Sequence, residues 1–375
     1  ILLVVGRILQ GIGAGIALPL MFNIVLQQAP VGKLGVMMGF ATLIIAIAPA
    51  VGPSFGGFLV EAFGWRSIFL VLLPLLGLSL VLGALTVRQA RDVEKVGFSP
   101  VQFLLVAAGF TALVVAVNAA SESAWTSPKT LGLLALAFAL LAGFTWISRR
   151  SDTPLLRVRI FTDRTYSLSL AYAVLIQAAV LALGYLIPYF AQVAKSVGSF
   201  AAGCLLLPGC IIGAILTPFG GRLLDRFGAK RPILAGAAVG VATLACFAAF
   251  GAEGSAVRLA FIYVFFPICQ GLSLSNSMTH GLRSLPEDLQ ADGNAAFNTV
   301  QQLGGAVGTA VAAAIVNSAQ AGSSGDVVAG TTAGAQTAFH VLLGAGAAAF
   351  AAALGVFLRP RRGQAEKRSR SGLID

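Results

Sequence analysis

The sequence contains very little charge for its length. Only 10% of its 375 residues are Asp, Glu, Lys or Arg, and 57% are hydrophobic, whereas a soluble globular domain carries about 25% charged residues. The mean hydropathy is +0.89. This composition excludes a soluble globular domain and predicts a protein that folds in lipid.

Residues that bind metals or carry covalent catalysis are also scarce. The four cysteines, Cys204, Cys210, Cys246 and Cys269, show no metal-ligand spacing, so we interpret them as small apolar packing residues. An intramembrane enzyme needs a catalytic cluster such as paired histidines, HExxH or GxSxG, and the sequence contains none of these. We therefore predict that the protein is not an enzyme and has no cofactor and no metal site.

The sequence is instead rich in apolar runs of about 20 residues, each long enough to cross a hydrocarbon core as a helix. We predict eleven spans, at residues 2–27, 35–60, 67–87, 100–118, 130–148, 167–190, 200–219, 232–250, 257–278, 294–316 and 338–358. The expected fold class is an all-α integral membrane protein, a polytopic helical bundle.

Basic residues alternate between rich and poor breaks along this series of spans. One set of breaks, with the C-terminal tail, carries 20 Lys and Arg, the other set carries 4, and Arg7 lies inside the first span. The positive-inside rule places the rich set, and with it the C-terminus, in the cytoplasm of a multi-pass cell-membrane protein. The net charge of +11 is thus a topology signal that needs no nucleic-acid partner. Eleven crossings then place Ile1 on the outer face, and with no initiator Met we expect an odd number of further spans before it; a miscounted span is the alternative.

Two short motifs stand out within this frame. The second span ends in "APAVGPSFGGFL", where Pro53 can kink the helix and Gly52, Gly56 and Gly57 allow another helix to approach closely; generic close packing is the alternative.

The break "GGRLLDRFGAKRP" suggests a charged latch between two helix ends, with Asp225 as an acceptor for Arg or Lys; a solvated basic loop is the alternative. The predicted latch residues are Gly221, Arg222, Asp225, Arg226, Gly228, Lys230 and Arg231.

Together these motifs resemble the major facilitator superfamily, and more narrowly its drug:proton antiporter family with fourteen spans. "GRILQGIGAG" resembles that family's fourth-span motif, "AVGPSFGG" the antiporter motif of its fifth span, and "GGRLLDRFGAKRP" its loop latch between spans ten and eleven. The resemblance runs from Gly6 to about Leu358 in the right order. It implies eleven transmembrane helices of a probable fourteen, with the first three before Ile1.

The resemblance also implies a division of the chain. Residues 1–88 would be the last three helices of an N-terminal six-helix bundle, 89–164 an inserted helix pair with cytoplasmic connectors, 165–358 a C-terminal six-helix bundle, and 359–375 a basic cytoplasmic tail. A faint repeat supports two related bundles, because "ILQGIGAG" echoes "ICQGLSLS" and places Gln10 and Gln270 in equivalent positions.

The function that the resemblance implies is a proton-coupled antiporter that exports amphipathic drugs or related small molecules by alternating access. Its partners would be a small-molecule substrate, protons and the lipid bilayer, and it would act as a monomer. Two alternatives remain: a dedicated exporter of one metabolite, lipid or siderophore, or a truncated paralogue that no longer transports.

Arg7 is the residue that most needs an explanation. A guanidinium at the centre of a membrane helix costs roughly 2.5 to 3.5 kcal/mol on insertion scales. Gln10, Gly11 and Ala14 follow on the same helical face, which would point Arg7 into the bundle. We predict that Arg7 and Gln10 serve proton coupling; the alternative is that Arg7 snorkels to the outer surface.

Polar and aromatic side chains inside the spans are the candidates for a substrate cavity, because polar groups in lipid are costly unless they face a bundle interior or water. The predicted cavity residues are Asn23, Gln177, Tyr185, Tyr189, Gln192, Asn276, Asn298, Gln301 and Gln302. Gln301 departs from the family, which commonly has an arginine there. The spans contain no clear buried carboxylate, so the sequence assigns no proton carrier.

Overall fold

The structure is a computed structural model that describes residues 2–30, 32–86, 99–123, 126–151, 154–252, 254–323 and 325–358. Over these residues the chain is almost entirely helical and contains no strand. A helix satisfies all its interior backbone hydrogen bonds within itself, which is what a segment surrounded by lipid requires. The predicted all-α membrane fold is confirmed.

The helices are α1 (Leu2–Gln28), α2 (Leu34–Phe63), α3 (Ser67–Thr86), α4 (Pro100–Ser123), α5 (Pro128–Arg150), α6 (Arg164–Lys195), α7 (Ser199–Cys204), α8 (Leu207–Phe227), α9 (Lys230–Phe250), α10 (Ala256–Ser284), α11 (Glu287–Gly322) and α12 (Val327–Phe357), and a 3₁₀ helix, η1 (Val158–Thr162), lies between α5 and α6. Within the described residues, ten segments are long and apolar enough to cross a membrane, with α7 and α8 counted as one. At 30 residues, α2 is also long enough.

The structure differs from the seventh predicted span in two ways: the helix is interrupted, and it ends later. The sequence predicted a single helix over 200–219, but the chain turns between α7 and α8, and α8 continues to Phe227. Pro208 stands in the first turn of α8, where its missing N–H costs nothing, so the chain can restart a helix there. Gly228, with φ of 77°, ends α8 in a conformation that favours glycine.

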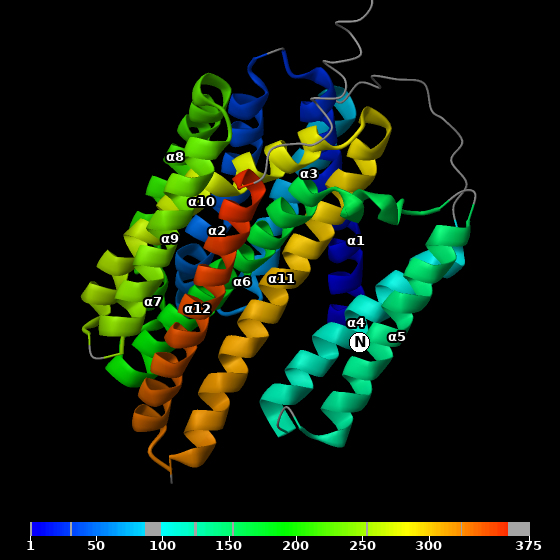
Figure 1. The fold of residues 1–375 in the computed structure, drawn as a ribbon. Coiled ribbons are helices and arrows are strands. Elements are labelled where there is room, and N and C mark those ends of the chain that lie inside the picture. The colour runs from blue at the N-terminus through cyan, green and yellow to red at the C-terminus, as the bar shows by residue number, and fades with distance from the viewer. Residues whose placement is uncertain are drawn as a thin grey trace, which may run out of the picture.

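Helices α6 to α12 form the larger part of the molecule (Figure 1). α6 packs against α10, α11 and α12, while α10 also packs against α8 and α9. Between α8 and α10 the backbones lie close, because a Cβ on Gly213 would be 2.7 Å from the carbonyl oxygen of Pro267. The largest fully buried side chains here include Tyr172, Phe247 and Phe339.

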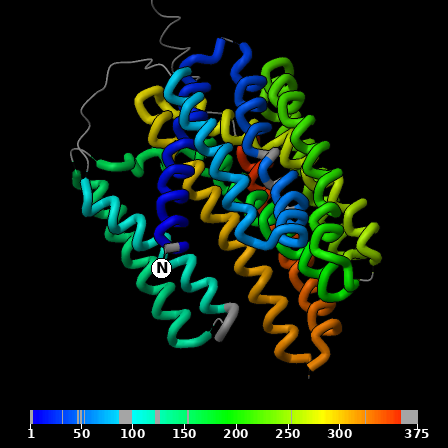
Figure 2. The backbone as a smooth tube through the Cα atoms, turned by 180° about the vertical axis from the view of Figure 1, so that it is seen from behind, coloured from blue at the N-terminus to red at the C-terminus, as the bar shows by residue number. Residues whose placement is uncertain are grey.

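The N-terminal helices meet this part of the molecule along one seam. α2 packs lengthwise against α8, and α1 contacts α2 and α11. α3 contacts α2, and none of its described side chains is buried. Helices α4 and α5 form a hairpin at the edge of the molecule, attached through α4 to α11 (Figure 2).

Candidate functional site

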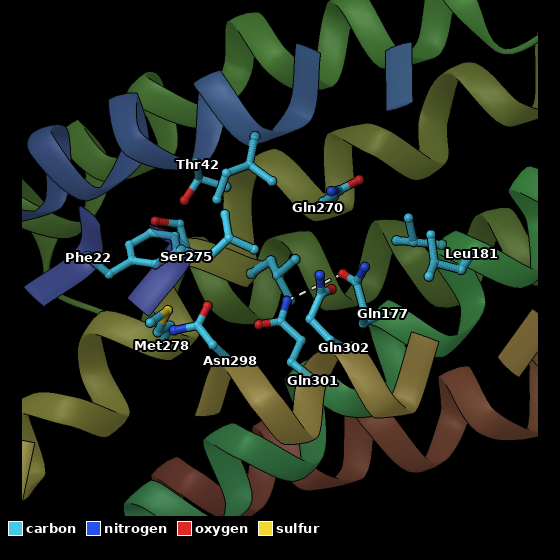
Figure 3. Close-up of a pocket in the computed structure, with 14 residues that line it drawn as sticks. Phe22, Thr42, Gln177, Leu181, Gln270, Ser275, Met278, Asn298, Gln301 and Gln302 are labelled. Atoms are coloured by element: carbon cyan, nitrogen blue, oxygen red, sulfur yellow. Dashed lines mark hydrogen bonds between the residues drawn. The ribbon is translucent and has the colours of Figure 1, made fainter. Parts of the chain in front are cut away.

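The structure has a cavity at the seam between the N-terminal helices and the larger helical group (Figure 3). It offers about 90 Å³ of space, and no charged side chain lines it among the described residues. Its lining comes from α1 (Leu18, Phe22), α2 (Thr42, Ile45), α6 (Gln177, Val180, Leu181), α10 (Gln270, Leu274, Ser275, Met278) and α11 (Asn298, Gln301, Gln302). Five helices from both sides of the seam therefore build one site.

Side-chain amides are the main polar groups of this cavity. Gln301 Nε2 donates to Gln177 Oε1 at 3.3 Å, and Gln302 and Gln270 line the same cavity (Figure 3). Asn298 Nδ2 donates to Asn294 Oδ1 at 2.8 Å. Amides both donate and accept hydrogen bonds, so such a site can bind hydroxyl, carbonyl and amide groups without a fixed charge.

Of the predicted cavity residues, four line this cavity and the others do not; the four are Gln177, Asn298, Gln301 and Gln302. Asn276 is buried between α10 and α8, where its Nδ2 donates to the carbonyl oxygens of Gly220 (2.8 Å) and Leu272 (2.7 Å). Backbone carbonyl oxygens thus satisfy the N–H₂ group of this amide, while its Oδ1 is buried without a hydrogen-bond partner among the described residues. Asn276 connects helices, and the expectation that it lines the cavity was wrong.

The remaining predicted cavity residues lie elsewhere. Tyr185 and Tyr189 stack with ring centroids 5.3 Å apart, and Gln320 Nε2 donates to the Tyr189 hydroxyl at 3.0 Å. Gln192 Oε1 accepts from Ser199 Oγ at 3.1 Å, next to the start of α7. Asn23 lines a separate pocket of about 660 Å³ with Glu287 and Asp288. These four residues do not contribute to the central cavity.

Sequence reasoning missed part of the α10 face of the cavity. Gln270 was considered only as the repeat equivalent of Gln10, and Ser275 and Met278 were not considered. Gln270, Leu274 and Met278 recur at a spacing of four residues, which places them on one helical face. This four-residue spacing, starting from a glutamine inside a span, is the sequence pattern that could have identified the α10 face of the cavity.

The predicted latch segment, residues 221–231, connects the two sides of the seam through Asp225. Its Oδ1 and Oδ2 accept hydrogen bonds from the backbone N–H groups of Gly35 and Val36, both at 3.0 Å. These N–H groups belong to the first turn of α2, where a carboxylate also favours the positive end of the helix dipole. Asp225, near the end of α8, thus caps a helix on the other side of the seam.

The expected partners of Asp225, Arg or Lys side chains of the same loop, were wrong. Within the described part of the chain Asp225 makes no ion pair, and the nearby cations lie over aromatic rings instead. The guanidinium carbon of Arg222 is 5.0 Å from the Phe219 centroid, and those of Arg226 and Arg231 are 5.2 and 5.5 Å from the Phe227 centroid. Lys230 begins α9, and Gly228 makes the turn before it.

Close backbone contact accompanies the Asp225 cap. A Cβ added to Gly221 would collide with the carbonyl oxygen of Gly35, and one added to Gly35 would be 2.6 Å from the Gly221 carbonyl oxygen and 2.8 Å from Asp225 Oδ1. One turn further, a Cβ on Gly39 would be 2.9 Å from Pro218 Cα. Only glycine permits this approach, so α2 and α8 touch backbone to backbone at this end.

The opposite end of α2 is also joined to the larger helical group. Glu61 Oε1 accepts a hydrogen bond from the Phe200 N–H at 3.2 Å, and a Cβ on Gly57 would be 3.3 Å from Phe200 Cα. Sequence reasoning assigned no role to Glu61 and missed this contact. With Asp225 at one end and Glu61 at the other, α2 is fastened across the seam at both ends.

The residues predicted for proton coupling lie outside the cavity. Arg7 Nη1 donates to Gln10 Oε1 at 3.1 Å, and the Arg7 guanidinium carbon is 5.4 Å from the Phe69 ring centroid on α3. Both Arg7 and Gln10 are exposed. Arg7 and Gln10 share a helical face, as their spacing predicts, but Arg7 is exposed and does not line the cavity.

The glycines of the predicted antiporter motif differ in how closely other helices approach them. Gly57 packs against Phe200, as described above, whereas a Cβ on Gly52 or Gly56 would meet no described atom within 4 Å. The side chain of Pro53 lies outside the described residues.

Comparison with known proteins gives consistent matches. Residues 1–309 match the family described as the Major Facilitator Superfamily. The lincomycin resistance protein LmrB of Listeria monocytogenes is 32% identical over 346 residues, which are 90% of this chain and 74% of that protein. LmrB of Bacillus subtilis is 31% identical over 320 residues, 85% of this chain and 67% of that protein.

Proposed function

The chain belongs to the major facilitator superfamily, a family of membrane transporters rather than enzymes, and we propose that it exports amphipathic drugs or related small molecules by proton-coupled alternating access. The protein is a multi-pass membrane protein with antibiotic-resistance relatives. In this proposal the amide-lined cavity is the substrate site, and the substrate leaves through the end of the seam that opens away from the cytoplasm.

The observation that carries the proposal is the position of the cavity on the seam, between two fastened ends of α2. The cavity offers about 90 Å³, well below the roughly 300 to 1,000 Å³ of drug-sized pockets. A drug therefore requires the seam to widen at one end. Release of Asp225 from Gly35 and Val36 would open one face, and release of Glu61 from Phe200 would open the other.

The cavity lining supports a substrate recognised by shape and neutral hydrogen bonds. Phe22, Leu274 and Met278 supply apolar surface, and methionine adapts to ligands of different shape. Gln177, Gln270 and Gln301 supply donors and acceptors. This combination fits amphipathic compounds, and lincomycin, named in two relatives, is the first compound to test.

Proton coupling is assigned to Arg7 with Gln10 as its hydrogen-bond partner. A fixed guanidinium lowers the pKa of a nearby carboxylate and so sets when that group binds and releases a proton. The planar fork of arginine fits such a partner better than the compact ammonium of lysine, so Arg7→Lys is expected to restore transport only in part.

The deciding experiment is proton-driven uptake of radiolabelled lincomycin into inverted membrane vesicles that contain the complete protein. Gln301→Ala is expected to raise the KM for lincomycin, and Arg7→Ala to abolish the dependence of uptake on the pH gradient without loss of protein from the membrane. Normal uptake by Arg7→Ala across the pH range would refute the coupling role. Absence of uptake of any amphipathic compound would favour the two alternatives, a dedicated exporter or a paralogue without transport.

A further inference from the structure

A second, positively charged pocket lies away from the transport seam, beside the α4/α5 hairpin. It occupies about 380 Å³ between the C-terminal end of α5 and η1. The residues that line it are Ser148, Arg149, Pro154, Arg157, Val158, Arg159 and Thr162. Three of these seven residues are arginines, which predicts an anionic ligand.

The backbone that forms this pocket is held in place by the hairpin. The Leu155 N–H donates to Gln102 Oε1 of α4 at 2.7 Å, and Ser148 Oγ of α5 donates to the Leu156 carbonyl oxygen at 2.5 Å. Ile160 in the middle of η1 is fully buried. These contacts fix residues 154–162 between the hairpin and α6 (Figure 1), so the pocket exists before any ligand arrives.

The charge in this pocket is only partly neutralised. Arg157 pairs with Asp288 at 2.8 Å and with Asp292 at 3.4 Å on α11. Asp163 is occupied as the cap of α6, accepting from the Tyr166 N–H at 2.7 Å. Within the part of the chain that the structure describes, which leaves out Asp152, neither Arg149 nor Arg159 forms an ion pair.

The surroundings of the pocket are those of a membrane surface. Arg149 and Arg150 end a helix long and apolar enough to cross the bilayer. Trp146, one turn earlier, is 58% exposed, with the Arg150 guanidinium carbon 4.3 Å from its ring centroid. Exposed tryptophan followed by arginine is typical of the headgroup level, and basic pockets beside membrane helices on the cytoplasmic side suit anionic lipid headgroups.

We propose that this pocket binds the phosphate group of an anionic phospholipid. Arg149 and Arg159 hold the phosphate, while Pro154 and Val158 provide apolar surface in the pocket. A free phosphate ion shares the charge chemistry but gains nothing from this apolar surface or from the adjacent bilayer. The lipid would fasten the α4/α5 hairpin and its connector to the membrane surface.

The test is native mass spectrometry of the purified chain in detergent, titrated with phosphatidylglycerol or with phosphatidylcholine of the same acyl chains. Arg149→Gln with Arg159→Gln is expected to weaken phosphatidylglycerol binding about thirtyfold, since each basic residue near a membrane surface contributes about 1 kcal/mol. The matched control is Lys129→Gln with Arg258→Gln, which removes two charges at the opposite ends of the spans and should leave the affinity unchanged. If the double variant fails to fold, Arg159→Gln alone should weaken binding about fivefold.

A second arm distinguishes a lipid from a soluble anion. Inorganic phosphate at the lipid concentration should not displace phosphatidylglycerol. The proposal is overturned if the double variant binds like the parent, if the control pair loses as much affinity, if phosphatidylcholine binds equally well, or if inorganic phosphate displaces the lipid at equal concentration.

Discussion

Replacement of Asp225 by asparagine should open the seam at the end where α2 begins. The carboxylate accepts two hydrogen bonds from the Gly35 and Val36 N–H groups, both at 3.0 Å. Asparagine keeps one acceptor but turns an N–H₂ donor toward the second N–H group and loses the charge that favours the helix end. Hydrogen bonds to a charged group contribute about 1.5 to 3 kcal/mol each, and because Asp225 is only half-buried we expect a loss of about 2 kcal/mol. This is roughly a thirtyfold shift toward the open state.

The assay measures access to the cavity. Ser275 lines the cavity and is 4% exposed, so a cysteine there reacts with a water-soluble maleimide only when the seam opens. In a background in which the four native cysteines are alanine, Ser275→Cys with Asp225→Asn should be labelled about thirtyfold faster than Ser275→Cys alone, from the face where α2 begins.

The matched control is Asp326→Asn. Asp326 caps α12 by accepting from the Ala329 N–H at 2.9 Å, but both residues lie on the same side of the seam. This variant loses a carboxylate charge at a helix start, as Asp225→Asn does, and should leave the labelling rate unchanged. An unchanged rate in Asp225→Asn, or an equal increase in Asp326→Asn, would refute the role of Asp225 as a fastener of the seam.

Three further predictions concern Glu61, Gly221 and the pair Gln177 and Gln301. Glu61→Gln should raise the labelling rate of Ser275→Cys from the face opposite Asp225 by less than about fivefold, because the exposed hydrogen bond from the Phe200 N–H to Glu61 contributes under about 1 kcal/mol. Faster labelling from the Asp225 face would contradict this assignment. Gly221→Ala should destabilise the α2–α8 contact by about 1 to 3 kcal/mol in thermal unfolding, whereas Gly143→Ala, with open space around it, should cost nothing. Gln177→Ala and Gln301→Ala should each raise the substrate KM, and their effects should not add, because the two amides are hydrogen-bonded; additive effects would show that they act separately.

The spans were predictable because lipid leaves the backbone few choices. The expected span 67–87 corresponds to α3 (Ser67–Thr86), and every other predicted span corresponds to helix, although the seventh is broken. The break between α7 and α8 escaped the sequence because "GCLLLPG" is apolar on both sides of the turn. Hydropathy reports burial in lipid and carries no information on whether the helix is continuous.

The site was predictable only in part, because a polar residue inside a span requires a partner but does not identify it. Gln301 donates a hydrogen bond to the side-chain amide of Gln177, whereas Asn276 donates to the backbone carbonyl oxygen of Gly220 on a neighbouring helix. Which outcome applies depends on how each helix is rotated against its neighbour. The expectation for Asp225 failed for a similar reason, because local cations are visible in the sequence and a helix end far away in the chain is not.

The Asp225 cap also determines when α2 and α8 can associate during synthesis of the chain. Gly35 and its cap are 190 residues apart. A ribosome adds about 5 to 20 residues per second, so the first turn of α2 waits about 10 to 40 s for its carboxylate. During that interval its N–H groups need water or a chaperone as a substitute. The nascent α2 is therefore expected to keep its first turn at the membrane surface, and the two sides of the seam are joined only after α8 has left the ribosome.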